Sequence, residues 1–404
     1  MIRMIKLMIS MCMLLSFLIT GTDVKPPSPT ETGESQFGFF PTGLYTVPYE
    51  NIPEIQPAGF NMVQVYHDTQ TLDEAIAYLE AAQANGLWVM QNMPRDFIDA
   101  GDEFWIEWVT RLSQYDALKW WYLPEEPTLR GVDHATLRRL YDIIHQYDPQ
   151  NRPVAMYFGI IGPLDQWCDI ADLIIVGCYP EYSQAPRACM KTWIDAAHLG
   201  CPSTPLVGAA SLFDSRTFGL PGGYPSPFQA RFDAYTALID GAQGLFWFSY
   251  ADGVQIPELW KGIHSLVAEL NSLAPVLQQG SAGLEIQARV LDGPEQSLPV
   301  NGITYNSIQF MHKGNHSQAH LFASNLSEKP VRAEFSGLPA GLTSVTVLFE
   351  DRTLPVSQGA FSDDFAGNDV HVYRLWDETP TAAAPQAAPP STTAPGETGP
   401  DQPG

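Results

Sequence analysis

The sequence predicts an α/β protein, a (β/α)8 TIM barrel followed by a small antiparallel β-sandwich. Between residues 37 and 274, short runs rich in β-branched and aromatic residues alternate with segments of helical period, as in βα units with a parallel sheet. From residue 275 to 377 the helical period stops, and apolar and polar residues alternate at period 2. A chain of 404 residues has room for both domains.

Eight strand candidates follow one another in the first domain. They cover residues 37–45, 61–67, 87–93, 119–123, 153–159, 172–179, 205–213 and 244–250. Helices are expected between and after them, at Leu72–Ala84, Phe104–Gln114, His134–Tyr147, Ala188–His198, Phe228–Gly241 and Leu259–Leu273. Eight strands in a segment of this length match a closed barrel. The alternative is a doubly wound open sheet, which usually carries a Gly-rich phosphate loop after its first strand, and residues 39–48 are not such a loop.

The second domain is predicted from six alternating runs. They cover residues 285–291, 303–313, 318–326, 331–337, 344–350 and 370–376. Turn sequences separate the runs, including residues 292–296, 314–317 and 363–369. Short strands divided by turns are typical of an antiparallel sandwich.

The overall charge excludes two classes of partner. Against 45 acidic residues the chain has 21 Lys and Arg, which gives a net charge of -24. Nucleic acids and anionic membrane surfaces are bound through clustered basic side chains, so neither is an expected partner.

Both ends of the chain are expected to lie outside the folded domains. Residues 1–21 place Arg3 and Lys6 before a short apolar run, as in a secretory signal peptide, and the run is too short to span a bilayer. Residues 22–36 are predicted to be a disordered linker, and residues 378–404 a disordered tail rich in Pro, Ala and Thr. The mature protein is therefore expected to be secreted, extracellular or periplasmic, with no membrane attachment after signal removal.

The cysteines outside the signal peptide are Cys168, Cys178, Cys189 and Cys201. An oxidising compartment permits up to two disulfides in three possible connectivities, and the sequence does not choose among them. No short C-x-x-C pair is present to begin a zinc site, so no metal is predicted.

The predicted strand ends carry many aromatic and polar side chains. In a barrel the active site lies at the carboxyl ends of the strands. The residues found there are Tyr45, Tyr66, His67, Asp68, Gln91, Asn92, Glu125, Glu126, Tyr157, Tyr179, Glu181, Asp214, Trp247 and Tyr250. Aromatic rings stack on sugar rings while carboxylates and amides bind hydroxyls, so these residues favour a carbohydrate site. The alternative for some of the tyrosines and tryptophans is ordinary core filling.

The most specific feature is the pair Glu125 and Glu126 at the end of the fourth strand. An aromatic surrounding raises the pKa of a carboxyl group and keeps it protonated, as a general acid requires. The structural alternatives are a loop cap or an ion pair with Arg130.

Residues 120–127, WWYLPEEP, resemble the fourth-strand signature of clan-A-like (β/α)8-barrel glycoside hydrolases of a secreted bacterial type. The resemblance implies that Glu126 is the acid/base and that Glu125 orients it. Residues 39–45, 58–66, 171–180 and 241–250 also resemble these barrels, and residues 361–376 resemble their C-terminal sandwich domain. The likeness covers most of residues 37–376 and implies a glycosidase that needs no cofactor.

Two positions depart from this pattern. Gly177 stands where the sixth strand of such barrels often has Asp, and residues 205–214 contain no Glu to act as the nucleophile of the seventh strand. Glycosidases need two carboxyl groups, so another residue has to supply the second one. The candidates, in order, are Glu181, Asp214 and Asp252. His67 with Asp68 could serve a hydrolase of another kind, but no Gly-x-Ser-x-Gly elbow accompanies them.

The sequence therefore predicts a hydrolase of O-glycosidic bonds. Glu126 is expected to protonate the glycosidic oxygen, and Glu181 or Asp214 to attack the anomeric carbon or activate water. The expected sugar platform consists of Tyr66, Tyr179, Trp247 and Tyr250, with Gln91 and Asn92 binding hydroxyls. Tyr45, His67, Glu125 and Tyr157 complete the expected substrate contacts. One alternative is a noncatalytic carbohydrate-binding protein, and another is that the sandwich binds the glycan while the barrel presents it.

Overall fold

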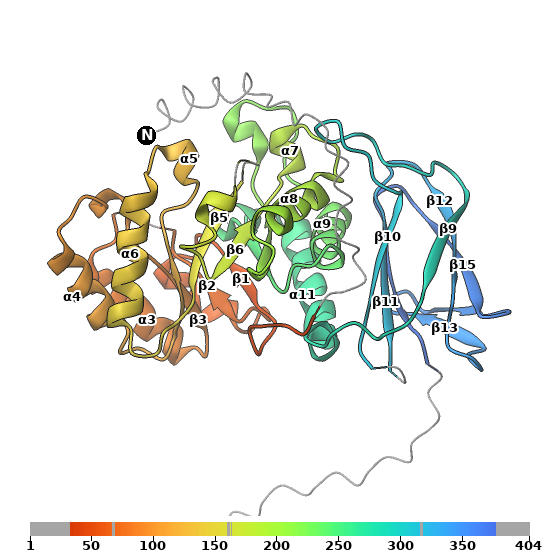
Figure 1. The fold of residues 1–404 in the computed structure, drawn as a ribbon, viewed down its shortest axis with the longest axis horizontal. Coiled ribbons are helices and arrows are strands. Elements are labelled where there is room, and N and C mark those ends of the chain that lie inside the picture. Colours follow the sequence, from red (N-terminus) through yellow and green to blue (C-terminus); the bar gives the residue numbers. More distant parts are fainter. Residues whose placement is uncertain (1–32, 67–68, 160–161, 163, 316–317, 377–404) are drawn as a thin grey trace, which may run out of the picture.

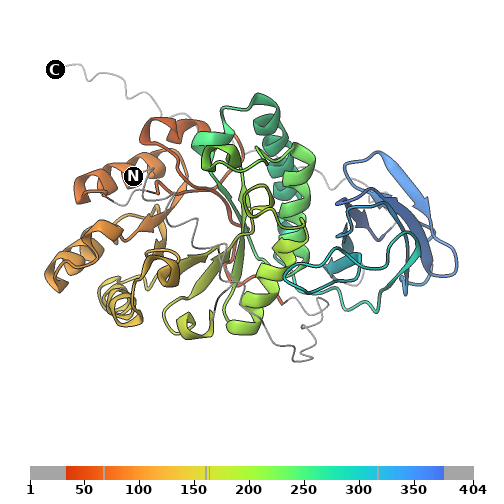
Figure 2. The same cartoon turned by 90° about the horizontal axis from the view of Figure 1, so that it is seen from above.

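The predicted fold class is confirmed by the computed structural model, which describes residues 33–66, 69–159, 162, 164–315 and 318–376. Eight parallel strands close into a barrel in sequence order, because β1 pairs with both β2 and β8 (Figure 2). The strands are β1 (Thr42–Leu44), β2 (Met62–Val63), β3 (Trp88–Asn92), β4 (Leu118–Tyr122), β5 (Val154–Phe158), β6 (Leu173–Val176), β7 (Leu206–Ser211) and β8 (Leu245–Phe248). The expected signal peptide, most of the linker and the tail lie outside the described residues.

Helices surround the barrel, and the sandwich lies to one side of it (Figure 1). The helices of the main layer are α3 (Leu72–Ala84), α4 (Asp102–Leu112), α6 (His134–Tyr147), α8 (Cys189–Gly200), α9 (Pro227–Ile239) and α11 (Pro257–Leu277). Capping boxes begin α3 at Thr71 and α9 at Ser226, which satisfies backbone N–H groups of the first turn. Shorter helical turns lie in the loops: η2 (Tyr49–Asn51), α2 (Ile52–Ile55), η3 (Arg95–Phe97), α5 (Pro127–Arg130), η4 (Leu164–Trp167), α7 (Pro180–Ser183), η5 (Ser215–Phe218) and α10 (Tyr250–Gly253).

Aromatic side chains fill the interior of the barrel. Phe246 of β8 points inward, and a Cβ at Gly43 of β1 would come within 2.3 Å of its ring, so only glycine fits there. Phe37, which precedes β1, packs on Trp120 of β4 with ring centroids 5.1 Å apart, and Phe39 lies 4.5 Å from Trp88. These contacts fill the end of the barrel at which the strands begin.

The second domain consists of two antiparallel sheets, with strand orders β10-β11-β16-β13-β14 and β15-β12-β9. Their strands are β9 (Gln287–Asp292), β10 (Ile308–Lys313), β11 (His320–Asn325), β12 (Val331–Ser336), β13 (Ser344–Val347), β14 (Arg352–Pro355), β15 (Ala360–Phe365) and β16 (Val370–Arg374). Within the described residues, no helix is both long and apolar enough to cross a membrane.

The sequence did not predict β14 and β15. Residues 363–369 were expected to form a turn, but Asp363, Asp364 and Phe365 continue strand β15. The reason is that the buried Asp363 carboxylate accepts hydrogen bonds from Arg352, at 2.6 and 2.9 Å, and from the Tyr373 hydroxyl, at 2.8 Å. These donors compensate the cost of turning a charged side chain into the sheet.

Two disulfides hold the ends of α8. Cys168 bonds to Cys201, just after the helix, and Cys178 bonds to Cys189, its first residue. The pairing, which the sequence left open, therefore ties α8 to the loop after β5 and to the end of β6.

Removing either disulfide is expected to destabilise the fold through the entropy of the unfolded chain. The bonded cysteines are 33 and 11 residues apart, so the Cys168→Ser/Cys201→Ser variant should lose about 4 kcal/mol of unfolding free energy and the Cys178→Ser/Cys189→Ser variant about 3 kcal/mol. Urea unfolding followed by circular dichroism measures both values. Equal stability of the wild type and both variants would contradict this account.

Candidate active site

The carboxyl ends of the strands bring together five tyrosines, which we call the tyrosine ring: Tyr45, Tyr66, Tyr122, Tyr157 and Tyr179. Tyr45 contacts the rings of Tyr66, Tyr122 and Tyr157, with centroids 6.2, 6.1 and 6.5 Å apart. Burial raises the pKa of Tyr45, Tyr122, Tyr157 and Tyr179, so their hydroxyls stay protonated and able to donate. The sequence analysis named every member of this cluster except Tyr122. Tyr122 could have been found from its position, because it lies two residues after Trp120 and side chains two apart on a strand point to the same side.

Glu125 forms an ion pair and accepts two further hydrogen bonds. Its Oε1 accepts from Arg130 Nη2 at 2.5 Å and from the Tyr66 hydroxyl, and its Oε2 accepts from the Tyr122 hydroxyl at 2.9 Å. Hydrogen bonds and a nearby cation both favour the charged form of a carboxyl group. The ion pair with Arg130, which the sequence left open for either glutamate, thus belongs to Glu125.

Glu126 occupies a different environment. Its Oε1 accepts a hydrogen bond from the Gly159 N–H at 3.0 Å, and among the described residues no Lys, Arg or His forms an ion pair with it. Burial raises the pKa of Glu126, and the bond from Gly159 opposes only part of that shift. A Cβ at position 159 would lie 2.8 Å from this oxygen and 2.7 Å from the Tyr157 hydroxyl, so the glycine makes room for both groups.

Left-handed backbone conformations cluster around this ring. Thr46, Tyr66 and Glu126 have φ angles of 60°, 54° and 48°, and they follow β1, β2 and β4. Such conformations cost on the order of 1 kcal/mol or more in residues other than glycine and are found preferentially at functional sites. The left-handed turn at Glu126 separates β4 from α5, whose first residue is Pro127.

The departure at Gly177 has a steric reason. A Cβ there would lie 2.7 Å from the backbone oxygen of Ala209 on β7 and 3.2 Å from the Tyr157 hydroxyl. The aspartate expected at this position from the resemblance has no room, because Tyr157 occupies the space.

Glu181, the first candidate for the second carboxylate, lies in a buried ion-pair cluster. Its carboxylate binds Arg187, and the same guanidinium reaches Asp233 of α9 at 2.5 Å. The three side chains are 8%, 7% and 2% exposed. Glu181 thereby fastens α7 to α9, and this placement does not support the catalytic role expected of it.

Asp214 and Asp252 lie near the ends of β7 and β8. Asp214 caps η5 and accepts from Arg216 at 2.8 Å, and these hydrogen bonds lower the pKa of Asp214. Asp252 accepts from the Ser249 hydroxyl. Besides burial, both carboxylates raise the pKa of Tyr224, so both lie near that residue.

Trp247 and Tyr250 lie away from the tyrosine ring, and this placement does not support the sugar platform expected of them. Trp247 is fully buried against Phe60 in the layer between the sheet and the helices, and Tyr250 bonds to Glu54. The inward neighbour Phe248 takes their place, with its ring centroid 5.5 Å from that of Tyr66.

The two polar residues at the end of β3, Gln91 and Asn92, are both buried and have different hydrogen-bond partners. Asn92 accepts from Gln64, whereas Gln91 is buried and donates to Gln70 at 2.9 Å. His67 and Asp68 lie outside the described residues. Within the described part of the chain, no group of three or more His, Cys, Asp and Glu side chains is arranged to hold a metal ion.

Solved structures share this fold. An α-amylase from Anoxybacillus superposes with a TM-score of 0.55 at 8% identity, over 85% of this chain and 99% of that one. A β-L-arabinopyranosidase from Geobacillus stearothermophilus gives 0.56 at 11%, over 85% and 98%. An α-amylase from Geobacillus thermoleovorans, complexed with acarbose, gives 0.51 at 10%, over 89% and 96%. The chain thus has a fold found in TIM-barrel glycoside hydrolases. No protein-family model and no curated protein matches it.

The structural role of the Glu181 cluster can be tested by removing its cation. Arg187→Met leaves two buried carboxylates without a partner, so the free energy of unfolding should fall by about 3–5 kcal/mol. The control is Arg216→Met, which removes an arginine that is 63% exposed and should cost at most about 1 kcal/mol. Urea unfolding compares the two variants, and an equally small loss in both would contradict the structural role.

Proposed function

We propose that the protein is a glycoside hydrolase whose general acid is Glu126 and whose ionised partner is Glu125. The observation that carries this proposal is the contrast between two neighbouring carboxyl groups. Arg130, Tyr66 and Tyr122 hold Glu125 charged, while burial without a cation favours the neutral form of Glu126. Environments that separate two carboxyl pKa values in this way assign the acid and the base of a site.

The two carboxyl groups lie near the same two tyrosines, Tyr157 and Tyr179. After burial, the charges of Glu125 and Glu126 both contribute to the raised pKa of Tyr179, and both also act on Tyr157. A glycosidic oxygen bound here would take its proton from Glu126 as its bond to the anomeric carbon breaks, while Glu125 stabilises the positive charge that develops at that carbon. A water molecule then adds to the anomeric carbon and returns a proton to Glu126. The tyrosine hydroxyls would bind sugar hydroxyls, and the rings of Tyr66 and Phe248 would contact the sugar face.

A second candidate function is noncatalytic carbohydrate binding on the same barrel. The observation in its favour is the end of β7, where no glutamate is present and Asp214 is engaged by Arg216. A panel of oligosaccharides separates the two functions, because a binder retains a glycan and releases no reducing sugar.

We also propose that the protein works outside the cytoplasm, in line with the signal peptide expected at residues 1–21. The disulfides at both ends of α8 support this location, since such bonds persist in oxidising compartments. Detection of the mature chain in a periplasmic or culture fraction, with a new N-terminus after about residue 21, tests it.

Replacing the general acid should reduce hydrolysis selectively. Glu126→Gln keeps the shape and removes the proton donor, so turnover of a glycan found in the panel should fall by about 10²-fold or more. The loss of turnover should be smaller for aryl glycosides with acidic leaving groups, because such a leaving group departs without being protonated. The matched control is Glu258→Gln on the exposed start of α11, which should leave turnover unchanged. Equal turnover of the wild type and Glu126→Gln would contradict the assignment.

The pH dependence should report the raised pKa of Glu126. The acid acts in its protonated form, so kcat/KM should fall as the pH rises through that pKa, above the value near 4.3 of an unperturbed glutamate. Initial rates measured from acidic to alkaline pH give the profile. In Glu126→Gln this alkaline decline should disappear, whereas a decline centred on the unperturbed value would show that burial does not tune this group.

A further inference from the structure

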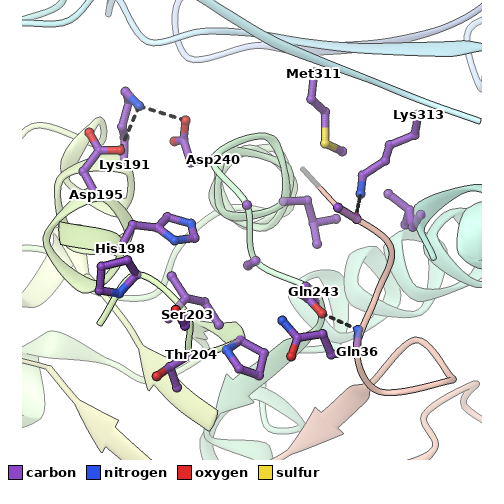
Figure 3. A pocket seen from close by; sticks show the side chains of 18 of the residues that line it. Gln36, Lys191, Asp195, His198, Ser203, Thr204, Asp240, Gln243, Met311 and Lys313 are labelled. Carbon is purple, nitrogen blue, oxygen red and sulfur yellow. Dashed lines mark hydrogen bonds and ion pairs between the residues drawn. The ribbon is translucent and has the colours of Figure 1, made fainter. Parts of the chain in front are cut away.

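A cavity of about 520 Å³ lies between the base of the barrel and the sandwich (Figure 3). Its walls come from α8, from the loops that precede β7 and β8, from β10 and from the segment before β1. Pro205 and Gln243, which line it, lie just before β7 and β8, so the cavity is at the opposite end of the barrel from the tyrosine ring. None of the residues assigned to the proposed hydrolase site lines this cavity.

Lys313 of β10 is a buried cation that forms no ion pair with the described residues. Its side chain lines the cavity, and its Nζ donates to the backbone oxygens of Gly33 at 3.1 Å and Gln279 at 2.9 Å. No carboxylate in the described residues forms an ion pair with it, and the residue is 6% exposed. Burial lowers the pKa of Lys313 to about 8, so it still carries its charge at neutral pH. A buried cation of this kind favours an anion bound beside it.

The other charged groups of the cavity form a cluster of one lysine and two aspartates. Lys191 of α8 donates to Asp195 and to Asp240, each at 3.1 Å, as the dashed lines in Figure 3 show. Burial lowers the pKa of His198, which keeps its ring neutral. The Asp240 side chain has no exposed surface, so it does not offer an acceptor to a ligand in the cavity. Lys313 is therefore the charged group of the cavity that forms no ion pair with the described residues.

The remaining walls combine hydroxyl and amide groups with apolar surface. Ser203, Thr204 and Gln243 supply the polar part, and Leu238 and Met311 supply the apolar part. The volume is that of a small-molecule site, and one inorganic anion would occupy little of it. We propose that this cavity binds a sugar acid, with the carboxylate beside Lys313 and the hydroxyl groups toward Ser203, Thr204 and Gln243. This site is independent of the proposed hydrolase activity.

Isothermal titration of the full chain with three related compounds tests the proposal. Glucuronate has both the carboxylate and the hydroxyls, glucuronamide lacks the charge, and inorganic phosphate lacks the sugar. Glucuronate should bind at one site about tenfold or more tightly than either of the others, because an ionised acceptor makes the stronger hydrogen bond. Equal affinity for glucuronamide, equal affinity for phosphate, or no heat with millimolar glucuronate would each overturn the proposal.

Variants assign the binding to this cavity. Lys313→Met keeps most of the aliphatic stem and should weaken glucuronate binding about tenfold, with hydrolysis unchanged. Lys329→Met, at an exposed lysine of the same domain, is the control and should bind like the wild type. Glu126→Gln should also bind normally, and a loss there would place the ligand at the tyrosine ring and overturn the assignment. If Lys313→Met does not fold, the comparison of glucuronate with glucuronamide on the wild type still decides.

Discussion

The chemistry proposed for the tyrosine ring depends on the partial burial of Glu126, which forms no ion pair with the described residues. Glu126 and Glu125 are neighbours in sequence, yet only Glu125 reaches Arg130. The left-handed turn at Glu126 and the short helix α5 produce this difference, because they direct Arg130 back to the first glutamate while the second meets the Gly159 N–H. A local backbone choice thus gives two identical side chains different surroundings: Arg130 pairs with Glu125, while burial raises the pKa of Glu126.

The distribution of cations distinguishes Glu126 from Glu125, Glu181 and Asp214, each of which is bound by an arginine. The chain has fewer than half as many basic as acidic residues, and its arginines and lysines bind particular carboxylates: Arg187 binds Glu181 and Asp233, Arg216 binds Asp214, and Lys191 binds Asp195 and Asp240. Ion pairs of this kind hold helices and loops together, and the pair between Arg130 and Glu125 is another of them. Glu126 is a carboxyl group and Lys313 a cation that form no such ion pair with the described residues. Glu126 lies at the carboxyl ends of the barrel strands, and Lys313 lines the cavity beside the opposite end.

Sequence reasoning predicted the eight barrel strands, and α3 and α6 at their observed bounds, because caps and periodicity are local signals. It failed where distant residues decide. Parallel strands are apolar on both faces, so the sequence of β8 did not show that Phe248 faces inward and Trp247 outward. Arg187 pairs with Glu181 of α7 and with Asp233 of α9, which is 46 residues away in the sequence. Asp363 was assigned to a turn because its partners, Arg352 and Tyr373, lie on other strands.

The interior of the barrel separates its two ends. Ring contacts run from Phe37 through Trp120 and Phe246 to Tyr45, with centroid distances of 5.1, 6.0 and 5.3 Å. Close-packed layers of this kind make the barrel a core and leave no channel along its axis. A ligand in the cavity beside Lys313 therefore cannot reach Glu126 through the barrel. Any contact between the two ends has to pass through the surrounding helices, of which α8 carries Lys191 and is bonded through Cys189 to Cys178, next to Tyr179.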